Sequence, residues 1–384
     1  MPRLIDLSNM EYTDTKVHII PIFADKNKKE LFYFCFYILL FPFLSCSENK
    51  SDVRAVCEKD ASGNYLIKWE TFPTLHTKVR IYESESPDEF VESQKVMELS
   101  SSEAVAYLPS SKDALSRKYF KLTFGRKAET VVSNRVVDAD KLYNFRDIGG
   151  YYTRNKEQLK WGMIYRSSSL AKASDEDDKV LDRLGIKTII DLRTDSDAIA
   201  APVRYQARQY FRFPLRGLDL LSYFRTALRG ELRSGDALIR QQDYNVALIK
   251  QNKDYLIKYF DLLLNEDNYP ILAFGELGKD RVGIFSYLTL CALGVTAEQI
   301  YEDYTLSNSN INVTDLIPGY DKMPIDTQES LAALLYSNER VILYIRKYIA
   351  DKYGSEDEYL KKELGLTSSK REKLKELMLY EKNN

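Results

Sequence analysis

The sequence predicts two domains, an all-β sandwich followed by an α/β domain with a central, mostly parallel sheet. A chain of 384 residues with 44% hydrophobic side chains is long enough to bury a core in each of two domains. Residues 64–137 alternate apolar and polar side chains with a period of two and contain no long helical pattern, which is typical of a sandwich. From Ala139 onward, short apolar strands alternate with helical segments, which is typical of an α/β fold.

The amino-terminal residues have the pattern of an export signal. Three lysines within residues 26–29 precede an apolar run at 31–44 that contains Pro42. This run is shorter than the roughly 20 apolar residues of a membrane-spanning helix. We therefore expect residues 1–45 to be a signal peptide or leader, and a buried amino-terminal helix is the alternative.

Cys46 follows the apolar run directly after Ser45, and the chain then becomes polar. A small residue before a cysteine at this place resembles the lipobox of bacterial lipoproteins, in which the cysteine becomes the lipidated first residue. The resemblance implies a lipid anchor on Cys46 and a tether over residues 46–55. It also implies a location in the bacterial cell envelope, either periplasmic or surface-exposed.

The first domain, residues 56–138, is expected to be the sandwich. Its period-two runs place apolar side chains on one face, and turn residues at 62–63 and 86–88 separate the runs. The inward residues are Tyr65, Ile67, Trp69, Val79, Ile81, Phe120, Leu122 and Phe124. The pattern loosely resembles a fibronectin type III module, with Trp69 and Tyr119 where such modules keep core aromatic residues. The resemblance implies a spacer or interaction module without chemistry.

The second domain, residues 139–384, is expected to carry its site at one edge of the sheet. Ser174 can cap a helix, and the apolar run 186–192 predicts the buried strand that follows. This strand leads to Asp191 at the carboxyl edge, where open α/β sheets bind ligands. The D-S-D sequence at 195–197 comes too late for a magnesium-dependent aspartyl phosphatase, and we interpret it as a helix start.

One stretch near the middle of the chain predicts an anion site. The short apolar run 271–274 predicts a buried strand, and helical spacing begins after Arg281, so a loop joins a strand to a helix. The amides of such a loop and the helix dipole converge on one point, and Lys279 and Arg281 add positive charge. The expected anion-binding residues are Glu276, Leu277, Gly278, Lys279, Asp280 and Arg281. Spacing alone also allows a turn whose charges face water.

The loop resembles the phosphate loop H-C-x-x-G-K-D-R-T-G of the cysteine-dependent tyrosine phosphatases, in the form found in a bacterial subfamily. The matching residues are Gly278, Lys279, Asp280, Arg281 and Gly283. Phe274 stands in place of the histidine, Gly275 in place of the nucleophilic cysteine, and Val282 in place of the threonine. The resemblance therefore implies that the anion cradle is present and that the nucleophile is missing.

Two further motifs match the same subfamily. Residues 144–150 resemble its N-F-R-D-x-G-G motif, and residues 191–193 resemble its D-L-R motif. Together with carboxy-terminal segments, the resemblance covers about residues 144–379 and implies a tyrosine-phosphatase-like α/β fold.

The resemblance also implies roles for individual residues. Arg281 would bind phosphoryl oxygens, and Lys279 would neutralise charge. Asp280 and Asp191 are the candidate acids. Gly275 has no side chain with which to form a phosphoenzyme.

Two functions follow from these observations. The first is a pseudophosphatase, an exported lipoprotein that binds a phosphorylated protein, lipid or small molecule with little or no turnover. The alternative is an active phosphoric monoester hydrolase that uses Glu276 or a positioned water. Carboxylates accept phosphoryl groups in other enzymes, although Glu276 does not occupy the position of the cysteine.

Composition narrows the partners and cofactors. The net charge of −2 gives no support for a nucleic-acid partner. The two histidines, His18 and His76, precede the second domain, which excludes a zinc site with imidazole ligands or a Ser-His-Asp triad there. We expect no metal and no cofactor. The arginine-rich segment 216–240 is either a solvated helix face or a lid over the anion site.

Overall fold

The structure, a computed structural model, describes residues 52–109 and 116–381. The predicted leader and the predicted lipidation site Cys46 lie outside the described residues and stay predictions. Among the described residues, no helix is long and apolar enough to cross a membrane.

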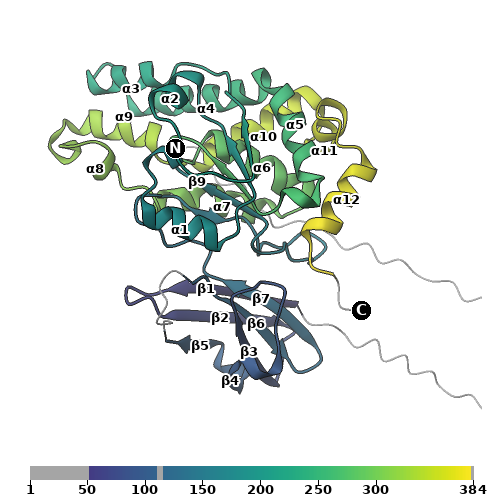
Figure 1. The fold of residues 1–384 in the computed structure, drawn as a ribbon. Helices are drawn as coiled ribbons and strands as arrows, with labels where there is room; N and C mark the ends of the chain where they lie inside the picture. The colour runs from purple at the N-terminus through teal and green to yellow at the C-terminus, as the bar shows by residue number, and fades with distance from the viewer. Residues whose placement is uncertain (1–51, 110–115, 382–384) are drawn as a thin grey trace, which may run out of the picture. The chain divides into compact units, whose positions relative to one another are not determined.

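Two antiparallel sheets form the first domain (Figure 1). One sheet has the strand order β1-β2-β5, and the other has the order β4-β3-β6-β7. The strands are β1 (Asp52–Lys59), β2 (Tyr65–Phe72), β3 (Lys78–Ser84), β4 (Lys95–Ser100), β5 (Val105–Leu108), β6 (Tyr119–Phe124) and β7 (Ala128–Ser133). Both sheets contribute alternate side chains to one hydrophobic core.

The period-two pattern correctly predicted most of this core. The predicted inward residues of the core cluster include Tyr65, Ile67, Val79, Ile81, Phe120, Leu122 and Phe124. Trp69 also lies in the cluster, as expected for a core aromatic residue. Tyr119 is buried elsewhere, in a separate cluster with Val131 and Trp161, so the expectation for this residue is wrong in detail.

The predicted tether at residues 46–55 is wrong in its carboxy-terminal part. β1 begins at Asp52, and Val53 lies opposite Thr71 of β2. Val53 and Cys57 are buried in the core, whereas charged side chains of the same strand remain accessible. These charges give the segment a polar composition, which hid its period of two.

A five-stranded sheet with the order β11-β10-β12-β9-β8 forms the centre of the second domain. Its strands are β8 (Arg146–Asp147), β9 (Ile164–Ser167), β10 (Thr188–Asp191), β11 (Gln209–Arg212) and β12 (Ile271–Phe274). β8 is antiparallel to β9, and the other neighbouring pairs are parallel, so the sheet is mixed but mostly parallel. The predicted domain boundary at residues 138–139 lies between β7 and β8.

Helices cover both faces of this sheet (Figure 1). They are α1 (Asp175–Arg183), α2 (Asp195–Ala200), α3 (Leu220–Leu228), α4 (Ser234–Gln251), α5 (Lys253–Leu263), α6 (Arg281–Leu293), α7 (Ala297–Thr305), α8 (Val313–Leu316), α9 (Ile325–Leu335), α10 (Glu339–Tyr353), α11 (Glu356–Glu358) and α12 (Ser368–Met378). Ile189 of β10 packs with α1, whereas its neighbour Ile190 packs with α5 and α6. Adjacent strand residues therefore serve two separate cores, because they point to opposite faces.

Two helix starts follow the capping rules used in the prediction. The Ser174 side chain accepts from the Asp177 amide at 3.3 Å at the start of α1. Thr194 caps α2 in the same way, accepting from the Asp197 amide at 3.1 Å. The D-S-D sequence at 195–197 is therefore a helix start, as predicted.

Buried polar contacts join the segments on either side of the predicted domain boundary. Arg117 donates to the Asp147 carboxylate at 2.7 Å and to the Tyr165 hydroxyl at 2.9 Å. The same carboxylate accepts from the amides of Gly149 and Gly162, each at 2.7 Å. The Asp147 side chain is inaccessible to solvent. Its charge is therefore compensated by three donors, one of which precedes the boundary.

Candidate anion-binding site

The predicted loop lies between β12 and α6, at the carboxyl edge of the sheet. β12 ends at Phe274 and α6 begins at Arg281, as the spacing predicted. Gly278 has a φ of +66°, and a Cβ atom on it would lie 2.5 Å from the carbonyl oxygen of Ser167. A side chain is excluded at this position, because both the backbone conformation and the close approach to β9 require glycine.

The first carbonyl groups of the loop are held by the surrounding chain. The Glu276 carbonyl oxygen accepts from the Ser169 amide and from the Tyr143 hydroxyl, each at 3.3 Å. The Leu277 carbonyl oxygen accepts from Asn144 Nδ2 at 3.0 Å. Asn144 is the first residue of the predicted N-F-R-D motif. It has a φ of 53°, a left-handed conformation that asparagine adopts more readily than most residues.

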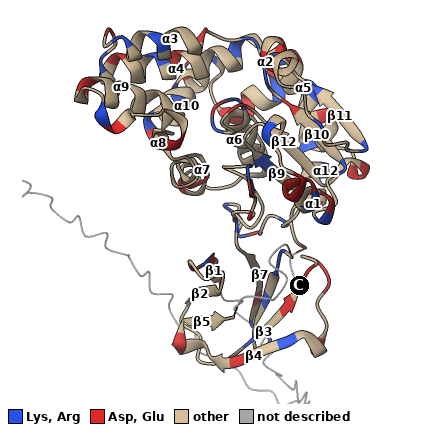
Figure 2. Cartoon of the chain, turned by 60° about the vertical axis from the view of Figure 1, so that its left-hand side comes forward, with Lys and Arg blue, Asp and Glu red and all other residues tan. Residues whose placement is uncertain are grey.

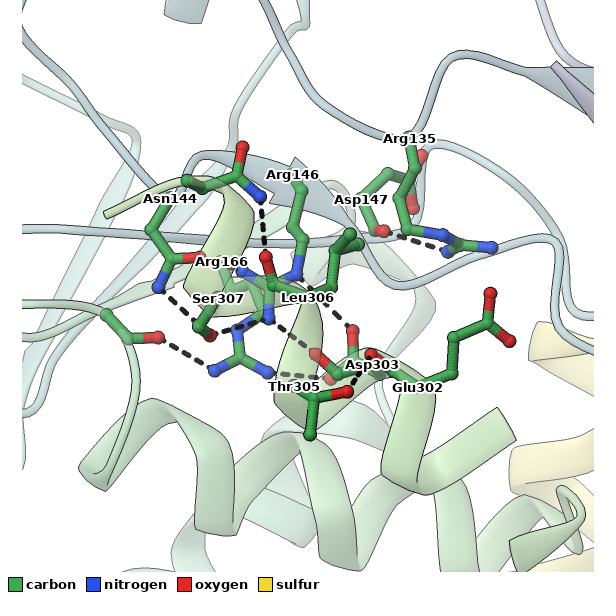
Figure 3. Close-up of polar contacts among 12 residues, drawn as sticks. Arg135, Asn144, Arg146, Asp147, Arg166, Glu302, Asp303, Thr305, Leu306 and Ser307 are labelled. Atoms are coloured by element: carbon green, nitrogen blue, oxygen red, sulfur yellow. Dashed lines mark hydrogen bonds and ion pairs between the residues drawn. The ribbon is translucent and has the colours of Figure 1, made fainter. Parts of the chain in front are cut away.

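Arg166 of β9 holds the next two carbonyl groups. Its Nη2 atom donates to the carbonyl oxygens of Gly278 and Lys279 at 2.7 and 3.3 Å. Its Nη1 atom donates to Asp303 Oδ2 of α7 at 2.7 Å. Arg146 completes this buried network by donating to the Asp303 carbonyl oxygen at 2.8 Å (Figure 3). Segments far apart in the sequence therefore fix the shape of one short loop.

The charges in this network shift one another's pKa. Burial alone would raise the pKa of Asp303, but the charges of Arg166 and Arg146 lower it below its ordinary value. Burial and the charge of Arg166 lower the pKa of Arg146 to about 10, against the opposing effect of Asp303. With two guanidinium groups and one carboxylate, the network places one net positive charge beneath the loop.

The amides of the loop are left free. Because a carbonyl and the next amide of a planar peptide point in opposite directions, holding the carbonyls of 276–279 outward turns the amides of 277–280 inward. Within the described part of the chain, no backbone acceptor pairs with the amides of residues 276–281. α6 is 13 residues long, so its dipole adds to them. The loop therefore forms a ready anion nest.

The side chains of Lys279 and Asp280 bind each other, and Asp280 also contacts α4. Lys279 Nζ donates to Asp280 Oδ1 at 2.8 Å, and Gln241 Nε2 donates to the same oxygen at 2.5 Å. The Lys279 side chain is inaccessible to solvent. Since Lys279 and Asp280 neutralise each other, Arg281 supplies the side-chain charge that remains for an anion.

Arg281 has unused hydrogen-bonding capacity. Its side chain is 17% exposed, and its Nη1 atom lies 3.7 Å from Asp197 Oδ2, which is longer than a hydrogen bond. Among the described residues, its buried Nε atom has no partner. Burial raises the pKa of the neighbouring Tyr244 to about 12, despite the opposing effect of Arg281, so the tyrosine is neutral at pH 7. Because the Arg281 guanidinium has an unpaired Nε atom and is partly exposed, it can donate two parallel hydrogen bonds to an anion.

Asp191 lies outside the loop in a closed ion pair. Arg193 donates to its two carboxylate oxygens at 3.0 and 2.8 Å, and the Tyr210 hydroxyl donates to Oδ2 at 2.7 Å. Burial and the bond to Asp191 raise the pKa of Tyr210 to about 12. The structure therefore places the candidates Asp280 and Arg281 within the loop and engages Asp191 with a partner of its own.

Comparison with known proteins agrees with this geometry. Residues 137–380 match the model of the tyrosine phosphatase family. The chain belongs to the tyrosine phosphatase family. The matched residues contain the loop, the network beneath it and the whole central sheet.

Two relatives resemble this tyrosine-phosphatase-family chain in sequence. A candidate tyrosine-protein phosphatase of Cupriavidus necator is 26% identical over 174 residues, which are 44% of this chain and 62% of that protein. A tyrosine-protein phosphatase of Nostoc commune is 26% identical over 145 residues, 37% of this chain and 47% of that protein. The chain thus spans less than two thirds of the length of either relative.

Two solved structures are also similar. One is the core catalytic domain of the PP-IP phosphatase Siw14 from S. cerevisiae, with 16% identity over 57% of this chain and 96% of that chain and a TM-score of 0.26. The other is P. aeruginosa TpbA, with 14% identity over 52% of this chain and 96% of that chain and a TM-score of 0.21.

Phe274 and Gly275 lie at the start of the loop, and Val282 lies in the first turn of α6. A Cβ atom on Gly275 would lie 3.4 Å from Val282 Cγ2 and 4.0 Å from Arg281 Cβ, which are ordinary contacts. Phe274 is fully buried, with the Arg193 guanidinium 5.1 Å from its ring centroid. Glu276 is the first exposed side chain of the loop. Gly275 therefore carries no side chain, although the backbone has room for a Cβ atom.

The described part of this phosphatase-family chain contains two cysteines, and both lie outside the loop. Cys57 and Cys291 are both free. Burial raises the pKa of each to about 12, so both are protonated at neutral pH. Residues 52–109 and 116–381 contain no group of three or more His, Cys, Asp or Glu side chains that could hold a metal.

The arginines of segment 216–240 are exposed to solvent. Figure 2 shows basic residues on α3 and α4. Arg216 binds Asp254 with two bonds of 3.0 Å, and Arg229 binds Glu231 at 2.8 Å. These local pairs favour the solvated-face interpretation for the two arginines.

Sequence reasoning missed four residues that shape the site, namely Arg166, Asp303, Gln241 and Asp197. Arg166 and Asp303 are 137 positions apart, and no spacing rule connects them. Gln241 lies on a mostly apolar face of α4 and carried no charge to attract notice. Arg166, Asp303 and Gln241 are polar side chains that the structure buries, whereas α2, which carries Asp197, has no buried residue.

Proposed function

We propose that this protein is an exported lipoprotein of the tyrosine phosphatase family that binds a phosphorylated ligand or another anion with little or no turnover. One observation carries the proposal. The loop at residues 276–281 presents unpaired amides to an anion, while Gly275 offers no nucleophile beside them. In this proposal, the loop binds the anion but provides no side chain at Gly275 that could form a covalent phosphoenzyme.

Several contacts support binding. The loop carbonyls are already held away from the ligand, so little reorganisation is needed when the anion arrives. Arg281 retains an unpaired Nε atom and partial exposure. In our proposal, the anion contacts the amides of Glu276, Leu277, Gly278, Lys279 and Asp280, and the amide and side chain of Arg281.

The remaining side chains support slow turnover at best. Asp280 is the candidate acid nearer to the anion, yet its Oδ1 atom already accepts from both Lys279 and Gln241. Asp191 is bound to Arg193 and Tyr210, which favours a role in supporting the sheet edge. Neither arrangement supplies a ready proton to a leaving group.

The alternative is an active phosphatase in which Glu276 or a positioned water attacks phosphorus. The exposure of Glu276 at the start of the loop is the observation that favours it. A carboxylate nucleophile would form an acyl phosphate as the ester P–O bond breaks and the alkoxide or phenoxide leaves, and hydrolysis of the acyl phosphate would regenerate Glu276 and release phosphate. The Glu276 side chain starts one residue beyond the family's nucleophile position, so this mechanism would need a shifted phosphate.

A paired measurement separates the two functions. Titration calorimetry with inorganic phosphate should show saturable binding, and hydrolysis of p-nitrophenyl phosphate should stay at the level of a blank. An active member of the family, assayed under the same conditions, gives the hydrolysis rate for comparison. Turnover that disappears in Glu276→Gln but persists in Glu302→Gln, a change on α7 outside the loop, would instead establish the enzyme.

The sandwich and the lipid anchor complete the proposal. We infer a fibronectin type III-like spacer or interaction module over residues 56–138, supported by the division of its strands into sheets of three and four. A lipid on Cys46 would hold the anion site at the envelope surface. Mass spectrometry of the membrane fraction tests this, since an unprocessed amino terminus would contradict it.

A further inference from the structure

One edge of the central sheet is open. β11 is the outermost strand on the side opposite β8, with β10 as its neighbour (Figure 2). The amides of Gln209 and Phe213 donate to carbonyl oxygens of the β10 side, each at 2.9 Å. The period of two then turns the backbone groups of Tyr210 and Arg212 away from the sheet.

These outward groups are unpaired. In residues 52–109 and 116–381, no backbone group other than those of the β10 ladder pairs with Tyr210 or Arg212. Two residues of an edge strand offer two amides and two carbonyls, which is the complement of another extended backbone. Open edges of this kind take up strands from other chains.

A groove follows the same edge. It has a volume of about 310 Å³ and is lined by Phe211 of β11, by Phe213 just beyond that strand, and by one face of α5 with the residue that follows the helix. Lys258, Asp261 and Leu262 lie on α5, and Asn265 lies just after it. Phe213 stacks on Tyr255 with ring centroids 5.3 Å apart, which fixes the aromatic floor. The groove thus lies where alternate side chains of an added strand would point.

The charges of the groove favour an acidic partner. Asp261 is already paired with Lys370 at 2.9 Å. Lys258 lies 5.5 Å from the Tyr255 ring centroid and forms no ion pair within the described part of the chain. Among the charged side chains that line the groove, only this one is left uncompensated.

We propose that β11 is a docking site for an extended peptide segment of a partner protein, which joins the sheet as an added strand. Its backbone pairs with Tyr210 and Arg212, an apolar side chain enters the groove against Phe211, and an acidic side chain pairs with Lys258. The open backbone argues for a strand rather than a helix, because only a strand matches its donors and acceptors. This surface is independent of the anion loop, so it stands whether or not that loop binds phosphate.

The test begins with a phage-displayed library of random 12-residue peptides, selected on the full chain. Enriched peptides should carry apolar residues at alternate positions and one acidic residue. Selection on Lys258→Glu should enrich basic residues instead, whereas selection on Lys127→Glu should give the wild-type result. Lys127 is a matched control, since it is exposed on a turn of the sandwich. Unchanged selection on Lys258→Glu would overturn the proposal.

Amide hydrogen exchange then locates the bound peptide. An enriched peptide, synthesised with its acidic residue, should slow exchange at Tyr210 and Arg212 by about tenfold or more, because their amides become bonded. Amides of Gln209 and Phe213, which are bonded already, should change little. Protection elsewhere, or protection of neither amide, would reject the site. Self-association of the chain through β11 without any peptide would also overturn it and make a second copy the occupant.

Discussion

Placing a thiol at position 275 tests the anion nest directly. Gly275→Cys adds a Cβ atom whose nearest existing atoms lie at 3.4 and 4.0 Å, so this atom makes only ordinary contacts. The residue has no positive φ, and the loop carbonyls are held by groups that the substitution does not touch. The variant should therefore fold with the loop unchanged.

The expected pKa of the introduced thiol follows from the free amides of the loop. A thiolate at this position faces the unpaired amides that follow it and the start of a 13-residue helix, and both favour the charged form. Thiols at helix starts have pKa values of about 3.5–7.5 against about 8.5 for a free cysteine, so we expect a pKa below about 7. A shift of 1.5 units corresponds to about 2 kcal/mol of preferential stabilisation of the anion.

Alkylation by iodoacetamide as a function of pH measures this pKa. Cys57 and Cys291 have pKa values raised to about 12, so at pH 7 only about one in 100,000 of each is a thiolate. The wild type is the matched control for every other cysteine. Modification that appears only in the variant and begins near pH 6 would support the nest. An introduced thiol that titrates near 8.5 would refute the reasoning, because the amides would then not favour an anion.

Phosphatase activity is the second readout of the same variant. The thiolate, Arg281 and the amides are the components of the family's attack on phosphorus, so hydrolysis of p-nitrophenyl phosphate should rise above the wild type. It should increase with pH through the lowered thiol pKa. The rate will fall short of a native enzyme, since a misplacement of about 1 Å can cost about a hundredfold.

Three other predictions concern separate parts of the chain. Arg281→Ala should weaken phosphate binding by about 1.5–3 kcal/mol in calorimetry, the range for hydrogen bonds to charged groups, and equal affinity would mean that the loop is only a turn. Arg117→Met should lower the free energy of unfolding in urea by about 3–5 kcal/mol, because it leaves the Asp147 charge buried with two amides alone, whereas a loss below 1 kcal/mol would show that water compensates it. Cys46→Ser should release the protein from the membrane fraction, and unchanged fractionation would count against a lipid anchor.

Sequence patterns predicted the local features of the site and missed the tertiary ones. The strand and helix flanking the loop were predicted correctly because an apolar run, a glycine-rich turn and helical spacing are encoded within about 25 consecutive residues. Gly278 was predicted as an anion-binding residue, and the structure shows that its backbone also approaches Ser167 closely. By contrast, nothing near Arg166 indicated that it would hold the loop carbonyls. The tether prediction was wrong because β1 is recognised by its pairing with β2, which lies beyond residue 64.

The anchoring of the loop carbonyls has a kinetic consequence. Asn144 and Arg166 hold the amides in their binding arrangement before any ligand is present. A ligand would therefore find nearly every molecule competent, with no minority conformation to wait for. Association should then be a single exponential process whose observed rate increases linearly with ligand concentration. Affinity differences among phosphorylated ligands would appear mainly in how long each one stays bound.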